Sequence, residues 1–279
     1  MTAARGLAAV PEPANRSGCA TCRTARCCVH FDPEVTGFDL ARVVTAHGLA
    51  PRAVARLRPA HARLAGRDGV RLGPSPETWL ACLRSRDPTP ETAADDGDGR
   101  PCAQLTDVAP GVRRCSIYPA RPMRCRTFPT ELGPRGVEVD NPDAICPPEA
   151  WSLDRTDVPT TRLLHLRAGV ERSVHRGFLG RWNALAQGDG ERSRRAMEDV
   201  FWDHLVATHV ALAEVVAPLF TSPEALAEAG GRWAALDREE APLADAALGP
   251  TAATLRRDLG SLADVVLQVR ALIGELSLG

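Results

Sequence analysis

The spacing of its cysteines constrains this chain more than any other feature. Four cysteines crowd into one short segment, CATCRTARCC, and four more follow singly along the chain. The full set is Cys19, Cys22, Cys27, Cys28, Cys102, Cys115, Cys125 and Cys146. The ninth cysteine, Cys82, lies apart in the apolar run WLACL. Thiols gathered in this way bind soft metals, form disulfides or carry out redox chemistry, so the fold has to bring distant segments together.

The N-terminal segment favours a reducing compartment. Residues 1–18 are rich in small residues and proline and predict a flexible tail, with too short an apolar stretch for a signal peptide. No run approaches the roughly 18 apolar residues of a membrane helix. We therefore expect a cytoplasmic protein with no membrane partner. In such a compartment thiols stay reduced, which favours metal binding over a disulfide scaffold.

Charge excludes some classes of partner. The formal net charge is −1, which argues against general binding to nucleic acid. All 34 basic residues are arginines, so no lysine is present for a Schiff base or a P-loop. A protein and a small molecule are both compatible with this sequence as its partner or substrate.

Composition divides the chain near residue 150. Residues 19–150 hold the cysteines and most of the prolines and predict a loop-rich, metal-stapled domain. Within it we expect helices at 39–49 and 51–65 and a short strand at 136–139. Residues 151–279 predict amphipathic helices. The expected fold is therefore mainly α, a cysteine-cluster domain followed by a helical bundle.

Apolar periodicity predicts the helices of the second half. One series at helical intervals is Leu163, Leu166, Val170, Val174, Phe178 and Leu185, and a second is Met197, Phe201, Leu205, Leu212 and Val216. Residues 188–190 separate the two series, and a capping signal at 221–223 begins a third helix. The last helix carries a heptad seam over 255–273, suited to packing in a bundle or to self-association.

The first four cysteines raise a question of geometry. Cys19 and Cys22 form a knuckle whose two-residue gap lets both sulfurs face one metal. Cys27 and Cys28 are neighbours, and in an extended chain their side chains point to opposite sides. We expect one of these two sulfurs to bind metal while the other packs, or each to serve a different site. Eight thiols permit two four-cysteine sites, or one site with auxiliary thiols.

The segment 113–129, RRCSIYPARPMRCRTFP, surrounds two cysteines with five arginines and no acid. Cations beside thiolates offset their negative charge, and they also hold carboxylates or phosphates. Arg121, Arg124 and Arg126 are therefore candidate catalytic residues, and the first two are candidate cofactor ligands. Tyr118, the only tyrosine, is a candidate hydrogen-bond donor or acid. The alternatives are that the arginines belong to a solvated basic loop and that the ring of Tyr118 serves only in packing.

The cysteine pattern resembles that of the YkgJ-type cysteine-cluster family. The CxxC-x4-CC run, the segment CSIYPARPMRCRTFP and the final cysteine carry the resemblance, which covers about 19–146. Members are described as zinc- or iron-chelating domains with eight cysteines, and flagellin lysine N-methylases are similar through the same cluster. The resemblance implies that the eight cysteines form the metal-site set. Cys82 lies outside the pattern and is expected to be a buried apolar residue.

Three functional hypotheses follow. Thiolates suit zinc and iron–sulfur clusters alike. Only one knuckle is present and Cys146 precedes a proline, as in some ferredoxins, so we favour an iron–sulfur cluster in redox or group-transfer chemistry. The second hypothesis is an enzyme, an S-adenosylmethionine-dependent N-methylase with Arg121 or Arg124 holding the cofactor carboxylate. The third is a zinc-stapled interaction module.

Overall fold

A computed structural model describes 25–86, 100–110, 112–133, 136–139, 157–189 and 193–217. Several sequence predictions fall outside these residues, namely the tail 1–18, the ligands Cys19, Cys22 and Cys146, the third helix from 221 and the heptad seam 255–273.

Two long helices confirm the periodicity of the second half. Helix α9 spans Val158–Gly188 and begins at Asp157, whose side chain accepts a hydrogen bond from the amide of Thr160. Helix α10 spans Arg194–Val216 and is capped by Ser193 in the same way. Buried side chains recur along both helices. Leu185 is an exception, since it is 65% exposed and does not belong to the buried face that its spacing predicted.

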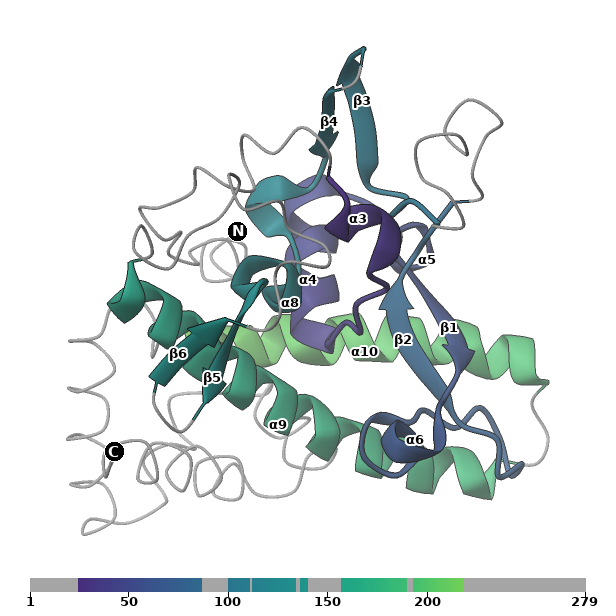
Figure 1. Cartoon of the computed structure of the whole chain (residues 1–279). Coiled ribbons are helices and arrows are strands. Elements are labelled where there is room, and N and C mark those ends of the chain that lie inside the picture. The colour runs from purple at the N-terminus through teal and green to yellow at the C-terminus, as the bar shows by residue number, and fades with distance from the viewer. Residues whose placement is uncertain are drawn as a thin grey trace, which may run out of the picture.

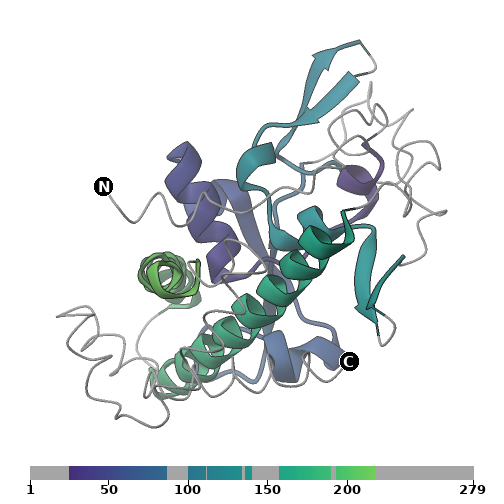
Figure 2. The same cartoon turned by 90° about the vertical axis from the view of Figure 1, so that its left-hand side faces the viewer.

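Helix α4, Gly37–His47, is the element on which these two helices pack. It begins with a capping box in which Thr36 and Asp39 each satisfy a backbone amide of the other. It ends at Gly48, whose φ of 64° is the left-handed conformation that glycine adopts freely. The prediction of a helix at 39–49 is confirmed, with a start two residues earlier. Figures 1 and 2 show α4 beside α10 and α9.

The rest of the described chain consists of short helices and three two-stranded antiparallel sheets (Figure 1). The helices are α3 (Cys27–His30), α5 (Pro51–Val54), α6 (Ala62–Asp68), the 3₁₀ turn η1 (Tyr118–Ala120) and α8 (Met123–Thr127). The strand pairs are β1 (Ala55–Pro59) with β2 (Trp79–Leu83), β3 (Leu105–Ala109) with β4 (Val112–Cys115), and β5 (Thr130–Gly133) with β6 (Gly136–Val139). The last of these confirms the short strand predicted at 136–139.

The continuous helix predicted at 51–65 is wrong. The chain leaves α5 at Val54 and runs as strand β1 before α6 begins. Strand β2 is an apolar run that needs a partner for its backbone groups, and β1 supplies it with Leu57 opposite Ala81. Helical spacing in 51–65 was therefore overridden by pairing with a segment more than twenty residues away.

Cys82 lies in the middle of β2 and is fully buried, as its apolar surroundings predicted. Burial raises the pKa of its thiol to about 12. The Nε of Arg58 donates to its sulfur at 3.0 Å. Cys82 is thus a neutral core residue.

One hydrophobic core serves the described parts of both halves of the chain. It includes Phe38 and Val43 of α4, Leu83 of β2, Phe178 of α9 and Phe201 of α10. The fold is mainly α, as predicted, and the division near residue 150 stays a prediction. Among the described residues, no helix has both the length and the apolarity needed to cross a membrane.

Candidate metal centre

Four separate segments bring five of the predicted ligands to one region. Cys27 and Cys28 lie on α3, Cys102 just before β3, Cys115 at the end of β4 and Cys125 on α8. The amide of Cys102 donates to the carbonyl of Cys28 at 2.7 Å. The amide of Leu105 donates to the carbonyl of Cys102, and Leu105 lies opposite Cys115 in the pairing of β3 with β4. Backbone hydrogen bonds therefore fix the approach of α3, β3 and β4.

The neighbouring pair Cys27 and Cys28 departs from the geometry expected from the sequence. The pair forms the first turn of α3, so its side chains do not point to opposite sides as in an extended chain. The two Sγ atoms are 4.0 Å apart. Two thiolates on one tetrahedral zinc ion lie about 3.8 Å apart, given a Zn–S length of about 2.3 Å. Both sulfurs are therefore able to bind one metal ion, contrary to the expectation that they could not easily share it.

The charges of these thiols interact. Burial raises the pKa of Cys102 to about 11 and holds the pKa of Cys125 well above its ordinary value. The negative charges of Cys102, Cys115 and Cys27 raise the pKa of Cys125 further. Contact with Cys27 raises the pKa of Cys28, whereas the same contact lowers the pKa of Cys27 to about 7. Partly buried thiols whose charges repel one another ionise together only beside a cation, which is the condition that a metal ion satisfies.

Arg121 is a predicted cation whose charge acts on these thiols. It is 7% exposed, and its guanidinium carbon stacks 3.9 Å from the centre of the Tyr118 ring. Burial raises the pKa of Cys115, and the positive charge of Arg121 partly offsets that rise. The same charge contributes to the lowered pKa of Cys27. Arg121 is thus within electrostatic range of two thiols from different elements.

The other candidates in this segment have different surroundings. Arg126 is buried and donates to the carbonyls of Arg121, at 3.1 Å, and of Pro119, so it holds the turn that presents Arg121. Arg124 lies 5.6 Å from the centre of the Phe31 ring. The hydroxyl of Tyr118 is buried without a hydrogen-bond partner among the described residues. A catalytic role for any of these residues stays a prediction.

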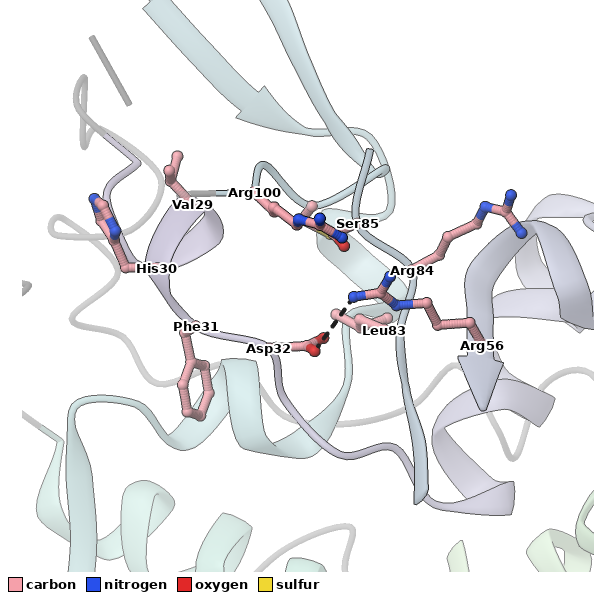
Figure 3. A pocket seen from close by; sticks show the side chains of 10 residues that line it. Val29, His30, Phe31, Asp32, Arg56, Leu83, Arg84, Ser85 and Arg100 are labelled. Carbon is pink, nitrogen blue, oxygen red and sulfur yellow. Dashed lines mark ion pairs between the residues drawn. The ribbon is translucent and has the colours of Figure 1, made fainter. Parts of the chain in front are cut away.

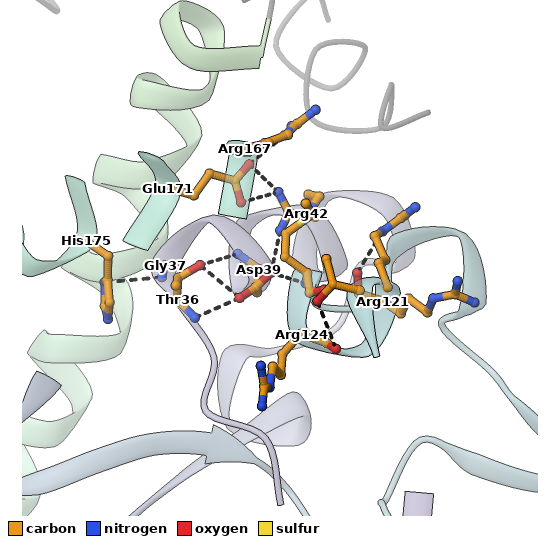
Figure 4. A network of polar contacts seen from close by, with 12 residues as sticks. Thr36, Gly37, Asp39, Arg42, Arg121, Arg124, Arg167, Glu171 and His175 are labelled. Carbon is orange, nitrogen blue, oxygen red and sulfur yellow. Dashed lines mark hydrogen bonds and ion pairs between the residues drawn. The ribbon is translucent and has the colours of Figure 1, made fainter. Parts of the chain in front are cut away.

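Sequence reasoning missed a buried ionic network that positions Cys125 (Figure 4). Asp39 Oδ1 accepts a hydrogen bond at 2.8 Å from the amide of Met123, the first residue of α8. Its Oδ2 accepts from the amide and the hydroxyl of Thr36, both at 2.9 Å. Asp39 therefore connects the start of α4 to the helix that carries Cys125. The Thr36-x-x-Asp39 pattern is a helix-capping signal, and it marks Asp39 in the sequence.

The network continues from α4 into α9. Arg42 forms an ion pair with Asp39 and donates to both oxygens of Glu171 at 2.7 and 2.9 Å. Arg167 donates to Glu171 at 2.7 Å. The four side chains are 4% exposed or less where they pair, so water does not screen these charges. The helical half thereby holds the element that presents a predicted metal ligand.

The described residues hold five of the eight predicted ligands. Among these described residues, no group of three or more His, Cys, Asp or Glu side chains is placed to hold a metal ion. The donor types fit a metal, because partly buried cysteines from α3, from the segment before β3, from β4 and from α8 lie in one region, and soft thiolates suit zinc and iron.

Cysteines from separate segments and a buried arginine thus lie in one region of the described chain. The sequence model of the CxxCxxCC family, described as a "putative zinc- or iron-chelating domain", matches residues 18–147. This confirms the predicted resemblance to the cysteine-cluster family and supports metal binding by this segment. No curated protein and no solved structure matches the chain.

Proposed function

We propose that the protein binds a metal centre through its eight cysteines and that this centre is an iron–sulfur cluster used in redox or group-transfer chemistry. The observation that supports metal binding best is that four segments bring five cysteines into one region, where their charges act on one another. Cys27, Cys28, Cys102, Cys115 and Cys125 would be ligands or auxiliary thiols, and Arg121 would offset their charge. When bound, an iron–sulfur cluster would supply one-electron transfer.

The second candidate is a zinc-stapled interaction module. The 4.0 Å between the sulfurs of Cys27 and Cys28 is compatible with it, because that separation is close to the one expected for two thiolates on a single tetrahedral zinc ion. In this case the metal stabilises the loop-rich region and the helices bind a partner. The N-methylase hypothesis stays a prediction, since no contact of the described residues bears on S-adenosylmethionine.

Anaerobic purification with analysis of iron, zinc and acid-labile sulfide tests the proposal. We expect iron and sulfide in the wild-type protein, together with visible absorption. Cys125→Ser should lose most of this metal, whereas Cys82→Ser, which alters a fully buried thiol outside the pattern, should keep it. Stoichiometric zinc without sulfide would favour the interaction module. A wild-type protein that holds no metal after anaerobic reconstitution, or equal metal loss in both variants, would refute the site.

A further inference from the structure

A cavity of about 490 Å³ lies beside the thiols (Figure 3). Its walls come from α3, from strand β1 and from the segments that follow β2 and precede β3. The lining residues that matter here are Asp32, Arg56, Ser85, Arg100 and Cys102. Since Cys102 is one of the predicted metal ligands, a molecule in this cavity would lie next to the thiol cluster. The volume suits a small molecule.

Positive charge exceeds negative charge on the wall of the cavity. Asp32 is the acid of the lining, and its Oδ2 lies 3.5 Å from the guanidinium of Arg56 and 3.5 Å from that of Arg58. One carboxylate is thus shared by two guanidiniums at distances longer than the 2.7–2.9 Å typical of charge-assisted hydrogen bonds. Arg100 adds a further positive charge to the lining. The cavity therefore attracts anions.

Two hydrogen-bond donors of the lining have no partner in the described part of the chain. They are the hydroxyl of Ser85 and the Nε of Arg56, and both atoms are shielded from solvent. In Figure 3 the side chain of Arg56 points to Asp32 and into the space between the labelled residues. A buried donor is normally satisfied, so a ligand that accepts hydrogen bonds fits this wall.

We propose that this cavity binds a small oxyanion, the carboxylate or phosphate group of a small molecule, and holds that molecule against Cys102. Guanidinium groups bind both kinds of oxyanion in a bidentate manner, and the Ser85 hydroxyl adds a neutral donor. The site is formed by side chains and needs no metal, so it goes beyond the proposed function. Its position makes it the place where an anionic substrate would meet the thiol cluster.

Calorimetric titration of the purified full chain with inorganic phosphate, and separately with succinate, tests this site. We expect at least one of the two to bind, and the tighter one identifies the group recognised. Ser85→Ala and Arg100→Gln should each weaken binding about tenfold, as expected for loss of one hydrogen bond to a charged group. Arg52→Gln is the matched control, because Arg52 is a surface arginine paired with Asp199 and does not line the cavity. It should change the affinity less than twofold.

Failure of this inference is distinguishable from failure of the proposed function. Absence of binding by phosphate and by succinate at millimolar concentration would overturn the oxyanion site, whatever the metal content. An equal loss of affinity in Arg52→Gln would overturn it too, since binding would then reflect general surface charge. Anion binding by a protein that holds no metal after anaerobic reconstitution would support the oxyanion site, while its lack of metal would refute the metal centre.

Discussion

Replacement of Glu171 by glutamine would test the buried ionic network. The carboxylate of Glu171 accepts hydrogen bonds from Arg42 and Arg167, and the side chains of all three residues are about 1% exposed. Together with Asp39 the network holds two positive and two negative charges. Glutamine keeps the shape of the side chain and removes one negative charge. The four-residue network then carries one positive charge in excess.

The burial of these charges determines how much stability Glu171→Gln loses. An arginine stays protonated even when it is buried, so it cannot relieve the imbalance by losing a proton. Breaking a buried ion pair by removal of one partner typically costs about 3–5 kcal/mol. We expect the free energy of unfolding of Glu171→Gln to fall by roughly this amount. Because Asp39 also holds the amide of Met123, the variant should also bind metal less tightly at Cys125.

Equilibrium unfolding in urea at pH 7 measures the effect, with the metal-loaded protein compared throughout. Asp199→Asn is the matched control, because it makes the same change of carboxylate to amide in a surface pair. Asp199 lies 2.6 Å from Arg52, but the two side chains are 56% and 38% exposed. Such a pair contributes below about 1 kcal/mol. Losses within 1 kcal/mol of each other in the two variants would refute the argument that burial makes this network strong.

Two further predictions concern the buried surroundings of His209. Burial lowers the pKa of His209 to about 4, so the folded protein keeps this ring neutral while the unfolded chain takes up a proton near its ordinary value of about 6.5. The stability that depends on this neutral ring is complete above about pH 6.5 and is lost as the pH falls towards 4, by up to about 3 kcal/mol. Urea unfolding at pH 7 and pH 5 should show this loss in the wild type and less of it in His209→Gln; equal losses would contradict the prediction. Gly37→Ala should destabilise by about 1–3 kcal/mol, since a Cβ there would lie 2.2 Å from Nδ1 of His209, whose ring is held by the carbonyl of Leu205. The control Gly177→Ala places its methyl in open space on α9, and a thermal melt that shows equal losses would refute the steric argument.

The sequence predicted those features that depend on local patterns. Helices α9 and α10 follow from apolar residues at helical intervals, and the cysteine region follows from spacing that few chains have by chance. The strand β1 was missed because its partner, β2, lies in a distant segment and decides its conformation. The pair Cys27 and Cys28 was placed in extended chain because nothing in the sequence marks the single helical turn of α3.

The network of Asp39, Arg42, Arg167 and Glu171 lay beyond sequence reasoning for a different reason. Charged residues on amphipathic helices normally face water, and each of these four fits that rule when its helix is considered by itself. They become buried only because α4 packs against α9. Arg42 and Glu171 are separated by 129 positions, so no periodicity relates them. The pairing is a property of the packed helices.

The segment that matches the family is shorter than the part of the chain that shares one hydrophobic core. The family match ends at residue 147, whereas the helices that cover α4 begin at Val158 and Arg194. A fragment cut at residue 147 would keep all eight cysteines and lose the apolar surfaces of Phe178 and Phe201 that pack in the same core. Transfer of the cysteine segment to another protein would therefore carry the thiols without the helices that pack on α4. We expect any working relative to provide α4 with a helical cover of its own, whatever the sequence of that cover.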